Sequence, residues 1–174
     1  MNASNQVTNK GCGLFYIKLG CLLFWTVWFS VAFTTNFFDF LSVVGWLSKG
    51  WHFLSGNYHA LVNVLHVYNT PPSLLNILFA LDISTQGISA ILFFTAFICF
   101  WRNVYVWQII SLAFGVSMAL WAAFLVMEEV FIAYPFEATH IRLLIFEMIC
   151  LLMFYLLPHQ IPHRRQKNKV QMIF

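Results

Sequence analysis

Charged side chains are scarce in this sequence. Only 9% of its 174 residues are Asp, Glu, Lys or Arg, whereas 61% are hydrophobic and 19% are aromatic. A soluble domain of this size cannot hide so much apolar surface in its interior. The composition therefore excludes a soluble globular domain and predicts a protein that lies in a lipid bilayer.

Alternation of polar and apolar residues is also absent, which excludes a membrane β-barrel. The chain instead has four apolar runs, each near the ~20 residues that cross a ~30 Å hydrocarbon core as a helix. Backbone groups in lipid must be hydrogen-bonded internally, so each run is predicted to be helical. The predicted spans, which form one membrane domain over residues 14–157, are 14–38, 74–101, 104–127 and 140–157.

The connections predict how these spans are arranged. Residues 101–103 form a tight hairpin, and the dipeptide Tyr134-Pro135 ends any helix before it, so consecutive spans should be antiparallel neighbours. We therefore predict an all-α membrane protein, a four-transmembrane-helix bundle with up-down-up-down topology.

The first connection, residues 39–73, is the only long one. Its stretch from Asn57 to Tyr68 has apolar residues at helical spacing, which predicts a short interfacial helix at the outer surface. A long loop with its own structure is typical of a cap over a site, although a plain packing element has the same pattern. His59, Asn63 and His66 lie on one face of this helix and are the polar residues we assign to the cap.

Basic residues predict the orientation, because Lys and Arg near span ends favour the cytoplasmic side. Seven of the nine lie at the ends that hold the two termini and the second connection: Lys10, Lys18, Arg102, Arg164, Arg165, Lys167 and Lys169. We expect a multi-pass protein of the cell membrane with both termini cytoplasmic, a polar arm at residues 1–13 and a basic tail at 158–174. The tail suits anionic lipid headgroups, so no nucleic-acid partner is expected.

Catalytic motifs and external cysteines are missing as well. We find no Gly-rich phosphate loop, no zincin motif and no Ser-His-Asp order of a membrane hydrolase. None of the four cysteines falls in a predicted external loop, so no disulfide framework is expected. These absences make an enzyme the less favoured interpretation.

The six acidic residues are distributed on one side only. All are predicted to lie outside the membrane or within its outer half, with Asp82 and Glu147 about 12 Å deep. A carboxylate at the centre of a span costs ~2.5 to 3.5 kcal/mol, so it normally faces the bundle and marks a site. Gln86 and His140 share faces with these two acids, which predicts a ligand-binding cluster of Asp82, Gln86, Glu129, Glu137, His140 and Glu147. The alternative is that Asp82 and Glu147 only link helices by hydrogen bonds.

A divalent metal is one candidate ligand. Glu137 and His140 have the Glu-x-x-His spacing of carboxylate-bridged di-metal bundles, and Glu147 lies on the same helix. The predicted metal ligands are therefore Glu137, His140 and Glu147. Glu137 also fits a local structural role, because an acid in the first turn of a helix complements the helix dipole.

Three functions remain open from these residues. The favoured one is a membrane-embedded binding module whose outer-half carboxylate and histidine pocket holds a metal ion, a proton or a small ligand. The second is a structural or accessory subunit that packs against other membrane subunits or another copy of itself. The third is an enzyme acting on a lipid or quinone at the outer interface.

Three short segments carry a resemblance to known proteins: TTNFFDFL at 34–41, ALWAAFLVMEEVFIAY at 119–134 and HIRLLIFEM at 140–148. With the layout of spans, they resemble a loose group of small four-helix integral membrane proteins of unknown function from prokaryotes. The resemblance implies a fold and no particular activity.

Overall fold

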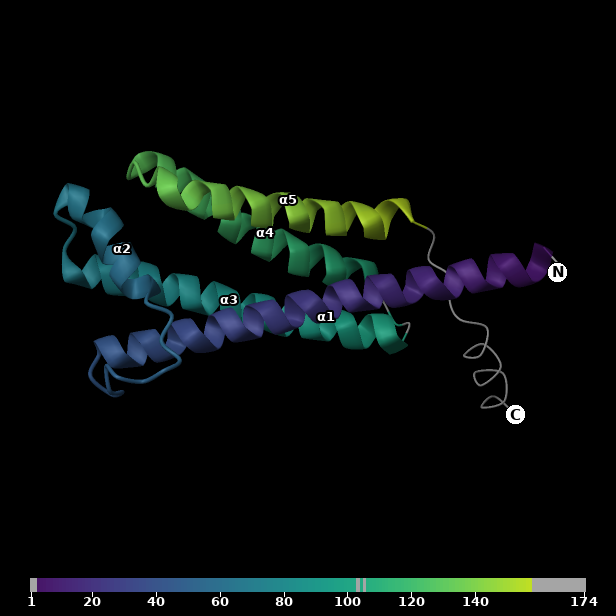
Figure 1. Cartoon of the computed structure of the whole chain (residues 1–174), viewed down its shortest axis with the longest axis horizontal. Coiled ribbons are helices and arrows are strands. Elements are labelled where there is room, and N and C mark those ends of the chain that lie inside the picture. Colours follow the sequence, from purple (N-terminus) through teal and green to yellow (C-terminus); the bar gives the residue numbers. More distant parts are fainter. Residues whose placement is uncertain (1–2, 103, 105, 158–174) are drawn as a thin grey trace.

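The computed structural model describes residues 3–102, 104 and 106–157, with side chains at 13–102, 104 and 107–157, and most of these residues are helical. Five α-helices and one 3-10 turn follow each other along the chain (Figure 1). Their bounds are α1 Ala3–Val43, α2 Asn57–Leu65, η1 His66–Tyr68, α3 Pro72–Arg102, α4 Val106–Val130 and α5 Tyr134–Leu156.

Four of these helices are long and apolar enough to cross a membrane: Gly13–Val43, Pro72–Arg102, Trp107–Val130 and Tyr134–Leu156. The predicted fold class is confirmed, including the short helix in the first long connection, which is α2. Helix α1 begins at Ala3, so part of the stretch expected as a polar arm continues the helix. Helix α5 begins at Tyr134 rather than at 140, because Pro135 fits the first turn, where a backbone donor is not needed.

The helices form two hairpins that are joined at one end. Helix α1 packs along α3, α3 along α4, and α4 along α5, whereas α1 and α5 touch over a short length only. In Figure 1, α1 and α5 are close at the end where α1 begins and α5 ends, and they diverge toward the end that carries α2. We name these the closed end and the cap end. The predicted up-down-up-down order is confirmed.

Aromatic side chains fill the core between the helices. Phe29 of α1 stacks on Phe93 of α3 with ring centroids 5.7 Å apart, and Phe93 meets Phe114 of α4 edge-on at 4.9 Å. Trp25 of α1 contacts Phe146 of α5 at 5.4 Å. Such pairs contribute ~0.5 to 1.5 kcal/mol each beyond the area they bury. They hold all four long helices together toward the closed end.

A buried lysine completes the closed end. Lys18 of α1 is only 1% exposed, and its Nζ donates hydrogen bonds to the carbonyls of Leu157 at 2.7 Å and Phe154 at 3.3 Å. These carbonyls lie at the C-terminus of α5, where a helix lacks internal donors and its dipole favours a cation. Lys18, which the sequence suggested only as an orientation signal, therefore also ties α1 to α5.

At the cap end, Asp39 of α1 holds the start of α2. Its Oδ2 accepts hydrogen bonds from the backbone N–H of Tyr58 at 2.9 Å and from the hydroxyl of Ser55 at 3.0 Å. The residue before α2 is Gly56, which has no side chain to cap the helix and adopts a φ of 74°. A carboxylate from another helix thus caps Tyr58, while the Ser55 hydroxyl oxygen accepts from the backbone N–H of Asn57 at 3.1 Å.

Two tyrosines fix the rest of the cap. The Tyr58 hydroxyl donates to Asn76 Oδ1 of α3 at 2.8 Å, and the Tyr68 hydroxyl donates to the Val130 carbonyl at the end of α4 at 3.0 Å. The Tyr68 ring also packs edge-on against Phe131. The first connection therefore spans the cap end from α1 to the turn between α4 and α5.

Candidate functional site

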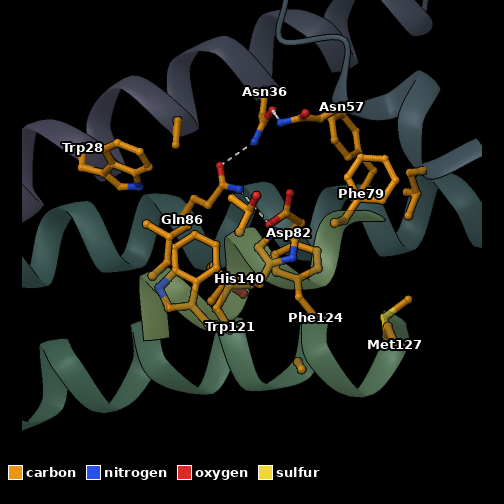
Figure 2. Close-up of a pocket in the computed structure, with 18 of the residues that line it drawn as sticks. Trp28, Asn36, Asn57, Phe79, Asp82, Gln86, Trp121, Phe124, Met127 and His140 are labelled. Atoms are coloured by element: carbon orange, nitrogen blue, oxygen red, sulfur yellow. Dashed lines mark hydrogen bonds between the residues drawn. The ribbon is translucent and has the colours of Figure 1, made fainter. Parts of the chain in front are cut away.

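A cavity of about 1360 Å³ lies between the diverging hairpins toward the cap end. All five α-helices contribute to its lining, which is mostly apolar, and Figure 2 shows 18 of its residues. Ala60, Leu61 and Val64 of α2 lie over it. The cavity therefore has a lid that is bonded to α1, α3 and the end of α4.

One side of this cavity opens between α1 and α5. Leu23, Val27 and Val31 of α1 line the cavity and are 47%, 54% and 57% exposed. On α5, the lining residues Phe136 and Thr139 are exposed as well. Both helices are long and apolar enough to cross a membrane, so the opening lies along two candidate membrane spans.

A chain of side-chain amides leads from the cap to a carboxylate inside the cavity. Asn57 Nδ2 donates to Asn36 Oδ1, Asn36 Nδ2 to Gln86 Oε1, and Gln86 Nε2 to Asp82 Oδ1, each at 2.8 Å. Figure 2 shows this path across α2, α1 and α3. Every amide donates toward Asp82, whose carboxyl oxygen accepts the last hydrogen bond of the chain. Asp82 and Gln86 were predicted to share a face, and the structure places both in the cavity lining.

A histidine and a glutamate form the second polar group of the cavity. His140 Nδ1 lies 2.5 Å from Glu128 Oε1, and the imidazole ring stacks on two neighbouring rings, Phe124 at 4.7 Å and Trp121 at 5.7 Å. Glu128 is 5% exposed, and its Oε2 is buried with no hydrogen-bond partner in the described part of the chain. The stacking fixes the imidazole plane, and the bond at Nδ1 leaves Nε2 as the ring nitrogen available to a ligand.

Glu147, predicted to belong to the ligand-binding cluster, lies beside the cavity and is bonded between helices. It is 0% exposed and does not line the cavity. Its Oε2 accepts from the Ser117 hydroxyl at 2.6 Å, and its Oε1 accepts from Trp121 Nε1 at 3.0 Å. The alternative interpretation, a hydrogen-bonded link between helices, describes this residue. Glu147 reaches the site only through Trp121, whose ring it holds against His140.

The predicted metal ligands do not come together. Among the described residues, no group of three or more His, Cys, Asp or Glu side chains is placed to hold a metal ion. His140 pairs with Glu128, Glu147 pairs with Ser117 and Trp121, and Glu137 is half-buried outside the cavity lining. The Glu137, His140 and Glu147 set is therefore not assembled as a metal site in this structure.

The cap presents its other face to the cavity. His59, Asn63 and His66 are exposed and absent from the lining, whereas the apolar side of α2 points inward. An interfacial helix turns its apolar face to the hydrophobic side, so its polar residues face away from a cavity in the bundle. Glu129 is exposed for a related reason. Successive residues on a helix point ~100° apart, so the inward position belongs to Glu128.

Sequence reasoning missed three residues of the site: Asn36, Asn57 and Glu128. Asn36 is a polar residue within an apolar run, which is a signal in its own right, because polar groups in a span normally bond across helices. Its partners Asn57 and Gln86 are distant in the sequence, so no spacing rule could have found them. Glu128 was recognised as part of the acidic turn, but the sequence did not predict that its side chain lines the cavity.

Comparisons of the chain with protein-family models, with curated proteins and with solved structures find no match. The fold and the site therefore define the molecule by themselves. It is a small multi-pass membrane protein with an intramembrane cavity that carries a few placed polar groups.

Proposed function

We propose that this protein is a membrane-embedded binding module that holds a small ligand in the cavity between its two hairpins. The observation that carries the proposal is the pairing of a large apolar cavity with two polar groups, the Asn57-to-Asp82 chain and the His140–Glu128 pair. Ligand sites are typically apolar cavities of ~300 to 1000 Å³ with a few convergent polar groups. The cavity here is apolar with a few polar groups, and its volume of about 1360 Å³ is above this typical range.

The cost of the polar groups supports a functional role. Each ionisable residue within a span costs a few kcal/mol, on the order of 2.5 to 3.5 at its centre, unless it contacts a partner or lines a cavity. Asp82, Glu128 and His140 all line this one cavity, in addition to the bonds between Asp82 and Gln86 and between His140 and Glu128. Ionisable residues gathered at a single cavity among apolar helices support a binding site there.

The orientation follows from the basic residues, and we infer that the closed end is cytoplasmic. Lys18 and Arg102 lie toward that end, and the cap end carries Asp39, Glu128, Glu129 and Glu137. The cavity would then be accessible from the outer leaflet of the cell membrane, under the cap.

The accessory-subunit hypothesis gains no specific support. Helix α5 exposes large apolar residues such as Ile145, Ile149 and Leu152 along its length. Such a face suits lipid and protein equally well, because a bilayer exerts no preference against exposed apolar side chains.

The test is to ask what the purified protein retains. Ala123 lines the cavity on α4, whereas its neighbour Ala122 is exposed and lies outside the lining. We expect mass spectrometry of the wild type in mild detergent to detect a co-purified small molecule. Ala123→Phe, which places a large ring in the cavity, should retain clearly less of it, and Ala122→Phe should keep it.

The opposite pattern would remove the proposal. If all three proteins retain the same molecules in the same amounts, those molecules coat the outer surface and the cavity is not a binding site. The same conclusion follows if the wild type retains no small molecule in a greater amount than Ala123→Phe does.

A further inference from the structure

The charges that line the cavity are one-sided. Asp82 and Glu128 contribute carboxylates, and His140 is the one residue there that can carry a positive charge among those described. No Lys or Arg of the described part of the chain lines the cavity. A negatively charged ligand would meet two carboxylates without a permanent cation to oppose them, in surroundings that screen charge poorly. The lining therefore selects against anions.

One carboxylate of this lining has an oxygen without a hydrogen-bond partner among the described residues. Glu128 is 5% exposed, its Oε1 is bonded to His140, and its Oε2 is buried with no partner in the described residues. An unpaired buried carboxylate oxygen is costly, and a cation or a hydrogen-bond donor removes that cost. The unpaired oxygen of Glu128 thus favours a positively charged or hydrogen-bond-donating ligand, as the negative charge of the lining does.

The walls of the cavity suit a cation with an apolar body. Trp28, Phe79, Trp121 and Phe124 line it, and aromatic faces attract cations by ~0.5 to 2 kcal/mol depending on desolvation. A bare metal ion is a poor fit, since no three-ligand group exists within the described residues. The large apolar area would also remain unused by a metal.

We infer that the ligand is a lipophilic organic cation, an amine or a quaternary cation with an apolar body, which enters from the bilayer between α1 and α5. This inference rests on the proposed function, because it names the ligand class of the same cavity. The positive centre lies against Asp82 and Glu128 beside the aromatic rings. The apolar body lies along Leu23, Val27 and Val31 of α1.

Two probes of equal size and opposite charge test this. Tetraphenylphosphonium and tetraphenylborate are added to the purified protein, and tryptophan fluorescence is followed, since Trp28 and Trp121 line the cavity. We expect saturable binding of the phosphonium at least tenfold tighter than that of the borate. Empty micelles of the same detergent subtract the probe that partitions into them. Ala123→Phe, which places a large ring in the cavity, should weaken the saturable binding.

Neighbouring acids on α4 supply the matched variants. Glu128→Gln should weaken phosphonium binding about tenfold, which corresponds to ~1.4 kcal/mol. Glu129→Gln removes the same charge from an exposed position outside the cavity and should leave the affinity unchanged. Asp82→Asn, which keeps the shape of the side chain, gives a second reading if Glu128→Gln does not fold.

The outcomes separate this inference from the proposed function. The cation inference is overturned if both probes bind with equal affinity, or if the borate binds more tightly, and Ala123→Phe weakens that binding. In that case the cavity remains a binding site. Unchanged phosphonium affinity in both Glu128→Gln and Asp82→Asn would overturn the cation inference as well. Failure of both probes, together with a wild type that retains no molecule, would remove the binding module itself.

Discussion

At the scale of single residues, the chain of amides is the feature that most clearly joins cap, bundle and cavity. Asn36 is 2% exposed and stands in its middle, donating to Gln86 and accepting from Asn57. Its removal leaves one buried acceptor and one donor without partners. We expect Asn36→Ala to lower the free energy of unfolding by about 1 to 3 kcal/mol in a chemical denaturation experiment.

The control for that change is an asparagine of the first connection. Asn63 is exposed on α2 and lies outside the cavity lining, so Asn63→Ala should change the free energy of unfolding by less than about 0.5 kcal/mol. Similar losses in both variants would mean that the amide chain contributes nothing beyond an ordinary surface contact.

The sequence predicted which side chains lie together when both residues are on one helix. It did not predict contacts between residues on two different helices. Asp82 and Gln86 are four apart on α3, so their shared face followed from helical periodicity, and they are bonded at 2.8 Å. His140 was placed near the cavity, but its partner is Glu128 on α4 rather than Glu137 or Glu147 on its own helix. The rotation of α4 against α5 decides that choice, and no residue spacing contains it.

At the scale of elements, the contact between α1 and α5 determines whether the cavity has a closed end. Lys18 is central to it, because its ammonium group satisfies the last carbonyls of α5 and lies 5.6 Å from the centre of the Phe154 ring. We expect Lys18→Met, which keeps the length and removes the donors, to lower the thermal midpoint by several degrees, since buried charged hydrogen bonds are worth ~1.5 to 3 kcal/mol.

Lys49 offers the comparison for that variant. It is an exposed lysine in the first connection, and Lys49→Met should leave the thermal midpoint within about a degree of the wild type. If Lys18→Met behaves like Lys49→Met, the buried lysine does not fasten α5 to α1.

Element prediction from the sequence was strong for existence and weaker for boundaries. The four apolar runs and the amphipathic stretch at 57–68 each became helix, because lipid and interface leave the backbone few alternatives. The start of α5 was missed since Pro135 was taken only as a helix terminator, although the first turn of a helix accepts proline. The direction of α2 was not predicted, because its neighbours were unknown.

At the scale of the whole molecule, the divergence of the two hairpins creates the site. The closed end is packed by aromatic rings and Lys18, and the cap end is bridged by α2 and the tyrosines. Between them α1 and α5 separate (Figure 1). The cavity in this region carries its polar groups toward the cap end and opens between α1 and α5. No sequence pattern predicts such a separation, because it depends on packing between helices at opposite ends of the chain.

The central claim, an open cavity between α1 and α5, is tested most directly by distances between spin labels in lipid nanodiscs. One pair is placed at the cap end, Phe37→Cys with Phe136→Cys, and the other at the closed end, Ile17→Cys with Leu156→Cys. All four positions are exposed, and the native cysteines are replaced by serine. We predict a clearly longer and broader distance at the cap end than at the closed end. Equal distances at both ends would show that α1 and α5 do not diverge and leave no cavity between them, which would contradict the account.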